Sequence, residues 1–166
     1  MSYKHSGPVV GATCYVKGDL VAKDVSIALP AITFVTYDFS ANGTVTLPTA
    51  LTEALELTIT KIGEDKGLLK LIQAGLTELE VRWAMEQVEN TGEKKIIGCK
   101  AFLNGYCKEI PSASITVGEA YENAIPYSIT RYRKVVDGKE QILIDKLKSK
   151  LTINGKNMMD AITKLL

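Results

Sequence analysis

Histidine and cysteine are scarce in this chain of 166 residues. His5 is the single histidine, and the three cysteines, Cys14, Cys99 and Cys107, contain no CxxC pair. A Ser-His-Asp or Cys-His catalytic device would have to be built on His5, close to the start of the chain. The cysteines indicate neither a disulfide framework nor a zinc site. We therefore expect no enzymatic activity, no metal ion and no cofactor.

A strong excess of one charge and long apolar runs are missing as well. The sequence has 20 Lys and Arg against 19 Asp and Glu, so nothing predicts specific nucleic-acid binding. The longest nearly apolar stretch, residues 25–35, contains Pro30 and is too short to span a bilayer. The first residues lack the apolar segment of a signal peptide. These absences predict a soluble protein made in a cytoplasm, with no membrane insertion by this chain.

Strand patterns dominate what is present. In residues 55–62, Leu55, Leu57 and Ile59 alternate with polar residues, which predicts a half-buried strand. Asp137-Gly138 is the strongest hairpin signal, because both residues of a type I′ turn need a positive φ. The other predicted strands and extended runs are 12–17, 20–29, 32–39, 44–47, 78–89, 95–110, 121–136 and 139–144. Beyond Asp145, lysines alternate with apolar residues, which predicts that the last of these strands continues.

Two short helices complete the prediction. One covers about residues 64–75, with Glu64 and Asp65 in its first turn, Gly75 at its end, and a buried stripe of Leu68, Leu69 and Ile72. The other covers about residues 157–166 and is capped by Asn157. Many strands with two peripheral helices predict a mainly β fold, an antiparallel barrel or sandwich, in a single domain 1–166.

One long segment and one arm stand apart from this core. Residues 38–52 are rich in Thr and Ala, and no Lys or Arg occurs anywhere from residue 24 to residue 60. The segment is either a flexible loop or a projecting hairpin that is ordered against another subunit, since loops this long in a small domain usually have a function. Residues 1–11 are interpreted as an N-terminal arm.

Two groups of charged residues can each be interpreted as structural or as functional. Glu78, Glu80 and Glu86 lie on one face of a predicted strand, where the usual exposure of glutamate favours a solvated surface over a carboxylate pair for glycoside hydrolysis. Lys146, Lys148 and Lys150 would form a basic stripe. The stripe either protects an exposed sheet edge or contacts an acidic neighbour.

The order of several short motifs carries a family resemblance. The motifs are Val21–Val25, Leu29-Pro30, residues 54–75, Gly105 with Lys108–Ile110, Tyr132–Lys134, Asp137–Glu140, Ile144-Asp145, and Asn154-Gly155 followed by Met158. From about Cys14 onward, the chain resembles the major tail tube proteins of contractile-tailed bacteriophages and of R-type, phage-tail-like bacteriocins. Two alternatives remain: the tube protein of a type VI secretion system, and a monomeric β-barrel that binds a small apolar ligand.

The resemblance implies a structural protein with a β-barrel-like fold. Members of that family form hexameric rings that stack into a hollow tube inside a contractile sheath, for DNA passage or membrane puncture. The implied partners are other copies of the chain, the sheath protein, and baseplate or terminator proteins. The implied location is the tail of a virion or bacteriocin particle, assembled in the host bacterial cytoplasm.

The resemblance also suggests roles for the residues already described. Residues 2–8 and the hairpin 38–52 are candidates for contacts between rings. Within the hairpin, the candidates are Tyr37, Asp38, Phe39, Asn42, Val45 and Leu47. Glu78, Glu80 and Glu86 are candidates for the lumen, where their charge would repel phosphate. Lys146, Lys148 and Lys150 are candidates for contact with a neighbouring subunit or the sheath.

Overall fold

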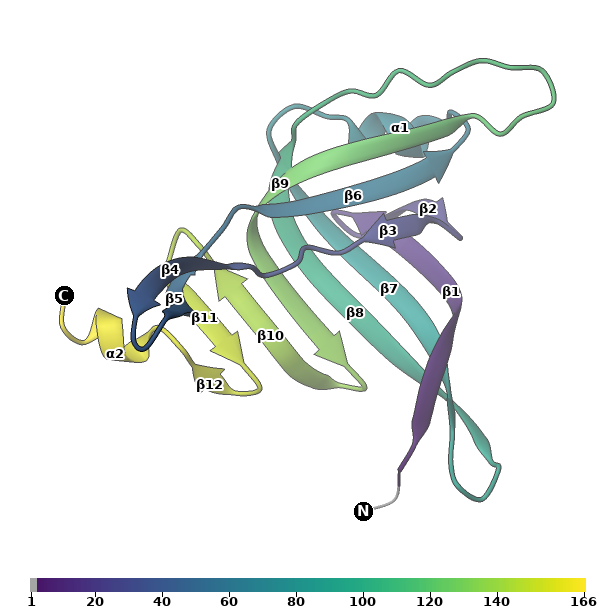
Figure 1. The fold of residues 1–166 in the computed structure, drawn as a ribbon. Helices are drawn as coiled ribbons and strands as arrows, with labels where there is room; N and C mark the ends of the chain where they lie inside the picture. Colours follow the sequence, from purple (N-terminus) through teal and green to yellow (C-terminus); the bar gives the residue numbers. More distant parts are fainter. Residues whose placement is uncertain (1–2) are drawn as a thin grey trace.

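The computed structural model describes residues 3–166, so Met1 and Ser2 of the predicted N-terminal arm lie outside the described residues. Most strands join one ten-stranded antiparallel sheet, whose main path has the order β12-β11-β10-β9-β8-β7-β1-β2 (Figure 1). The strands of this path are β1 His5–Val16, β2 Asp19–Lys23, β7 Leu76–Val88, β8 Lys94–Cys107, β9 Glu122–Val136, β10 Lys139–Asp145, β11 Lys150–Ile153 and β12 Lys156–Asn157. The mainly β, antiparallel prediction is confirmed.

Two further strands cover the inner face of this path. Strand β6 (Leu55–Ile62) pairs with the first half of β9 and with β3 (Ser26–Ala28). Its alternation is the predicted one, with Leu55, Leu57 and Ile59 all buried. They share one hydrophobic core with Val81 of β7, Leu103 of β8 and other inward residues of the main path. The fold is therefore a sandwich whose two layers are joined through β9.

Strand β9 changes neighbours because of an irregularity at its centre. Residues 122–129 pair with β6, and residues 131–136 pair with β10. The pairing with β8 shifts register between Asn104 and Gly105. A Cβ on Gly105 would lie 2.4 Å from the carbonyl oxygen of Ser128, so the bulge needs glycine there.

Within residues 3–166, strands β2 and β6 do not pair with each other. Helix α1 (Lys66–Leu71) and several side chains bridge the gap between them. The buried Lys61 Nζ donates a 2.7 Å hydrogen bond to the Val21 carbonyl and lies 3.2 Å from the Asp65 carboxylate. Gly67 allows α1 to approach this carbonyl closely, because a Cβ there would lie 2.2 Å from it. The sandwich is thus closed on this side by α1.

Both helices are shorter than the sequence predicts. Asp65 is the N-cap of α1 and accepts from the Leu68 N–H at 3.1 Å, and the helix ends four residues before Gly75. Leu69 is exposed, so its place in the predicted buried stripe is wrong; Leu71 is buried in its stead. Helix α2 covers only Asp160–Thr163, because Asn157 pairs in β12 with β11.

The predicted continuation of the strand beyond Asp145 is wrong. The chain reverses over residues 146–149 and returns as β11, so that Asp145 faces Lys150 across the ladder. The Asp145 carboxylate accepts from the Lys148 N–H at 3.2 Å, and Ser149 adopts a φ of 51°. These local interactions stabilise the turn. Lys146, Lys148 and Lys150 therefore do not line one face of a single strand.

Candidate functional site

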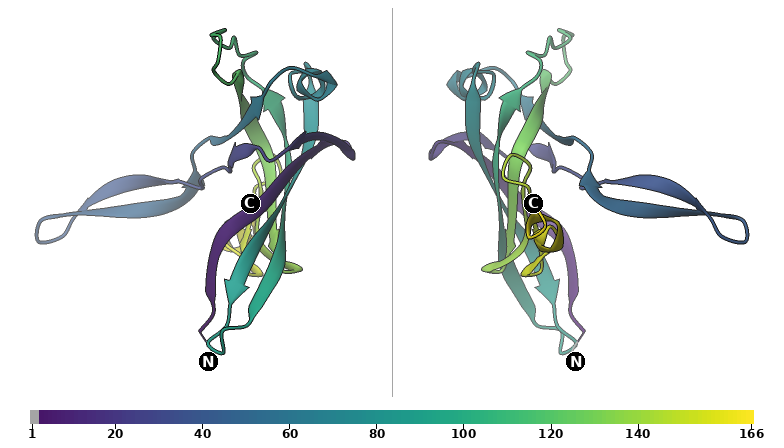
Figure 2. Two further views of the ribbon diagram at one scale, coloured as in Figure 1. Left: turned by 90° about the vertical axis from the view of Figure 1, so that its right-hand side faces the viewer. Right: turned by 90° about the vertical axis from the view of Figure 1, so that its left-hand side faces the viewer.

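Strands β4 (Phe34–Ser40) and β5 (Thr44–Thr52) form a separate hairpin that projects from the sandwich (Figure 2). Its turn is stabilised by a 2.9 Å hydrogen bond from the Ala41 N–H to the Gly43 carbonyl. Asn42 and Gly43 supply the positive φ angles, 51° and 117°, that this turn needs. The hairpin begins four residues earlier than the segment 38–52.

The two faces of the hairpin differ in chemistry. Phe39 pairs with Val45 and Tyr37 pairs with Leu47, so these four side chains share one face by the alternation of the strands. Asp38 pairs with Thr46 on the other face, where the threonine hydroxyl donates a 2.8 Å hydrogen bond to its carboxylate. We call the side of Tyr37, Phe39, Val45 and Leu47 the apolar face of the hairpin.

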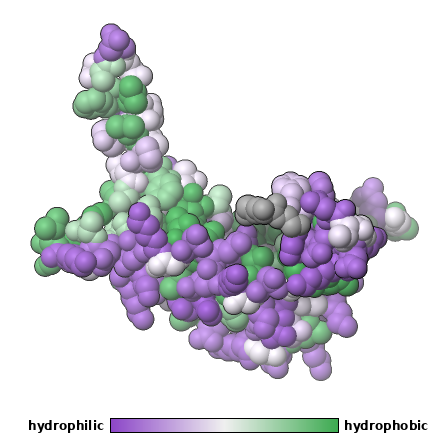
Figure 3. All heavy atoms as spheres, turned by 90° about the horizontal axis from the view of Figure 1, so that it is seen from below, coloured by the Kyte–Doolittle hydropathy of each residue, from purple (hydrophilic) through white to green (hydrophobic). Residues whose placement is uncertain are grey.

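The apolar face is open to solvent in the single chain. Tyr37 is 50%, Phe39 51%, Val45 41% and Leu47 38% exposed. Hydrophobic side chains gather along the protruding hairpin in the space-filling view (Figure 3). A contiguous exposed patch of this kind typically marks an interaction site. Of the six candidate contact residues, the structure brings these four together, places Asp38 on the opposite face and leaves Asn42 in the turn.

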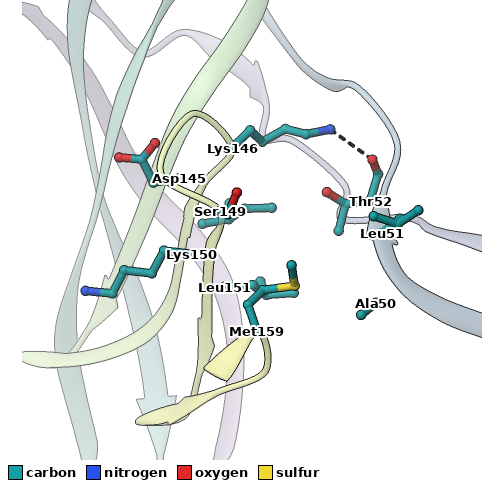
Figure 4. A pocket seen from close by; sticks show the side chains of 10 residues that line it. Ala50, Leu51, Thr52, Asp145, Lys146, Ser149, Lys150, Leu151 and Met159 are labelled. Atoms are coloured by element: carbon teal, nitrogen blue, oxygen red, sulfur yellow. Dashed lines mark hydrogen bonds between the residues drawn. The ribbon is translucent and has the colours of Figure 1, made fainter. Parts of the chain in front are cut away.

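The base of the hairpin is tied to the sandwich by Lys146. Its Nζ donates to the carbonyl of Thr52 at 2.9 Å (Figure 4) and to that of Glu53 at 2.8 Å. A small pocket of about 150 Å³ lies beside this contact and is lined also by Leu51, Leu151 and Met159. Lys146 therefore positions the hairpin within its own chain, a role that sequence spacing did not suggest because 93 residues separate it from Glu53.

The three candidate lumen residues lie on the polar face of β7, among both acidic and basic neighbours. Glu80 lies 2.7 Å from Arg82, whose guanidinium also sits 4.4 Å from the centre of the Tyr15 ring. The Glu80 hydrogen bond raises the pKa of Arg82. Glu86 lies 4.0 Å from Lys94. The carboxylates of Glu80 and Glu86 are thus partly neutralised by cations of the same face.

Further cations border the same face on β9. Arg133 is 2.8 Å from Glu140 and lies over the Phe102 ring, and Arg131 is 3.9 Å from Asp145. A concavity of about 540 Å³ is lined by Arg131, Arg133, Glu78 and Glu80 among others. The face around Glu78 and Glu80 therefore carries side chains of both charges.

Another exposed apolar segment was not singled out from the sequence. The connection between β8 and β9 carries Ile110, Ile115 and Val117, all largely exposed. The sequence alone could have indicated this segment, because these apolar residues lie in an otherwise polar loop that contains Pro111. Within residues 3–166, no cluster of His, Cys, Asp and Glu could hold a metal ion. No helix in this part of the chain is long and apolar enough to cross a membrane.

Comparison with known proteins adds an independent observation. A family model described as phage tail tube protein FII matches residues 8–166, which is nearly the whole chain. The matched range includes the whole hairpin, the polar face of β7 and the three lysines. A search of curated proteins found no match.

Proposed function

The chain belongs to the phage tail tube protein FII family, and from that premise we propose that it forms hexameric rings which stack into the hollow inner tube of a contractile tail. Membership makes it a structural component of a virion tail that assembles with other copies into a tube. The finer statements, namely six copies in each ring, a surrounding contractile sheath, and a lumen for DNA passage or membrane puncture, are our proposal. The protein acts here as a structural element and not as an enzyme.

The observation that carries this proposal is the projecting hairpin with its exposed apolar face. A single chain leaves about half of the Phe39 and Tyr37 side chains in water. A polymer of identical copies would bury these side chains by one repeated heterologous contact. The family match supports this interpretation over both the type VI tube and the small-ligand barrel.

Electron microscopy of the concentrated, purified protein tests the assembly. We expect stacked rings or hollow tubes of uniform width. A deletion of residues 40–46 removes the tip of the hairpin and leaves its base, with Lys146 bound to Thr52 and Glu53, intact. This variant should fold and not polymerise, and normal tubes from it would exclude the hairpin as a contact between rings.

The polar face of β7 remains our candidate for the lumen. Glu78, Glu80 and Glu86 would weaken phosphate binding there, and Arg82 would limit the net charge by pairing with Glu80. Replacing the three glutamates by lysine should slow DNA passage or block ejection while tubes still form. Unchanged infectivity would remove this face from the lumen.

The three lysines at and after the turn between β10 and β11 have separate roles in this proposal. Lys146 donates hydrogen bonds within its own chain, and Lys148 and Lys150 are exposed. We propose Lys148 and Lys150 as contacts with a neighbouring subunit or the sheath. Glutamate at both positions should weaken sheath binding to assembled tubes in a cosedimentation assay; glutamine at both positions separates charge reversal from simple loss of charge. Unchanged binding by the glutamate variant would exclude the sheath as their partner.

A further inference from the structure

The hairpin formed by β4 and β5 has few attachments to the sandwich. Its two strands pair only with each other, and the chain enters and leaves it through residues 29–33 and 53–54. Within residues 3–166, the only hydrogen bonds that join residues 34–53 to the sheet come from the side chain of Lys146. A single ammonium group therefore provides the polar attachment of the whole hairpin.

Apolar packing holds one side of the hairpin base better than the other. Leu29 and Ile32, in the chain that enters the hairpin, pack against the buried core. Leu51, near the end of β5, is 61% exposed and lines a pocket of about 150 Å³ together with Leu151 and Met159 (Figure 4). Side chains that border unfilled space have no packing contacts on that side. Packing therefore leaves the end of β5 loosely held.

Lys146 acts on this loosely held end from a fixed position. Its backbone N–H donates to the Thr130 carbonyl at 3.0 Å, which ties the start of the β10–β11 turn to β9. Its side chain extends from the turn toward the end of β5, where Nζ binds two successive carbonyls (Figure 4). Hydrogen bonds from an ammonium group are roughly twice as strong as those between neutral groups. Because residues 24–60 contain no Lys or Arg, the hairpin and its connections could not supply this cation themselves.

We propose that Lys146 is a positioning residue for assembly, which fixes the direction of the hairpin in the unassembled chain. The inference rests on the proposed function, because the direction of the hairpin matters for assembly only if copies form a tube. A hairpin that already points in one direction loses little conformational freedom when the tube forms, whereas a swinging hairpin must be ordered at that moment. Lys146 thus lowers the protein concentration that polymerisation needs, and it does so through contacts within its own chain.

Distances between two spin labels measure the direction of the hairpin in the unassembled protein. Thr44 near the tip of the hairpin and Lys139 in the sandwich are both exposed, so a cysteine at each position accepts a label. Cys107→Ser removes the half-buried native cysteine, and the other two, Cys14 and Cys99, are buried. Pulsed electron paramagnetic resonance at a protein concentration too low for tubes should give one narrow distance distribution when Lys146 is present.

Three variants of the labelled protein separate the ammonium group from the rest of the side chain. Lys146→Met keeps an unbranched apolar side chain without a donor, and it should broaden the distance distribution. Lys146→Arg restores a cation with several donors and should narrow the distribution again. Lys156→Met is the matched control, because Lys156 is an exposed lysine of β12 that does not line the pocket beside the hairpin base. It should give the wild-type distribution.

The same substitutions in unlabelled protein test the effect on assembly. Sedimentation gives the critical concentration, below which tubes do not form. For Lys146→Met it should rise about tenfold, because each added copy must then order its hairpin as it binds. Lys146→Arg should restore it to within about threefold of the wild type. A merely structural role of Lys146 would instead lower the thermal stability of the sandwich and leave the distance distribution narrow.

The outcomes separate this inference from the proposed function. A distance distribution of Lys146→Met as narrow as that of the wild type would overturn the positioning role and leave the tube function standing. A broad distribution with an unchanged critical concentration would also overturn it, because the direction of the hairpin would then not limit assembly. A wild-type protein that forms no tubes would overturn the proposed function and the role of Lys146 in assembly together.

Discussion

Replacing Phe39 by serine tests the assembly contact quantitatively. Phe39 is 51% exposed in the single chain, so about half of its surface is available for burial between copies. An aromatic side chain buries roughly 200 Å² in full, so about 100 Å² is at stake here. At about 25 cal/mol per Å², the lost contact is worth about 2.5 kcal/mol for each docked hairpin.

The critical concentration for polymerisation is the quantity to measure. If each added copy docks one hairpin, about 2.5 kcal/mol corresponds to about a 70-fold increase in critical concentration. Sedimentation of tubes at a series of protein concentrations gives this value directly. The Ser40→Ala variant has its substitution on the opposite face and should polymerise as the wild type does.

The same variant must be shown to fold. Because Phe39 lies on an exposed projection, its replacement should change the free energy of unfolding of the sandwich by less than about 0.5 kcal/mol. Thermal unfolding followed by circular dichroism checks this. A critical concentration within about threefold of wild type, with normal folding, would refute the assignment of Phe39 to a buried contact between copies.

Three further predictions concern the fold. Gly105→Ala would place a Cβ 2.4 Å from a carbonyl oxygen of β9, and we expect a loss of about 1–3 kcal/mol and a Tm lower by about 2–12 °C. Gly98→Ala in the same strand meets no atom within 4 Å, and an equal effect there would contradict the steric explanation. Tyr127→Phe removes the hydroxyl that donates to the buried Leu71 carbonyl, and urea unfolding should show a loss of about 1–2 kcal/mol; an unchanged midpoint would mean that the hydrogen bond contributes nothing. Burial raises the pKa of Cys14 and of Tyr132 to about 12 each, so both side chains hold their protons more tightly in the folded than in the unfolded protein. The free energy of unfolding should therefore be constant below about pH 8.5 and fall from there to about pH 12. A constant urea midpoint across that range would exclude this linkage.

The fold was predictable where local chemistry decides it. The alternation in residues 55–62 indicated both the bounds and the buried face of β6, because one side of that strand meets the core and the other does not. Asp137-Gly138 predicted its hairpin, since these residue types accept the positive φ angles of 49° and 77° that the turn has. Asn42-Gly43 marked the tip of the hairpin for the same reason.

The errors arose where another contact overrode a periodic pattern. The lysines after Asp145 alternate as a strand would, but the Asp145 carboxylate binds the Lys148 N–H and the chain turns. Leu69 fits a helical stripe, yet Leu71 is the residue that meets the core, because α1 is oriented by its close approach to Val21. Periodicity alone cannot assign the side of a six-residue helix that faces the protein.

The candidate site was predictable only in part. The sequence pointed to the hairpin and to six of its residues, since a long segment without lysine or arginine is unusual in a small domain. It could not place Val45 and Leu47 on the face of Tyr37 and Phe39, because that depends on the pairing of β4 with β5. The apolar groove beside Trp83 was not predictable, as its lining residues include Val9, Ile27, Trp83 and Lys134, which only the folded sheet brings together.

The sequence by itself determined most of the strands, the tight turns and the family of this protein, because these depend on side-chain alternation, on residues that accept positive φ, and on the order of motifs along the chain. Only the tertiary structure decided which strands pair, how β9 joins two layers, and which apolar surfaces stay open. Those outcomes depend on contacts between distant segments, such as Lys146 with Thr52 and Lys61 with Val21. Such contacts have no signature within a short stretch of chain, since each is made only when the rest of the sandwich has brought its partners together.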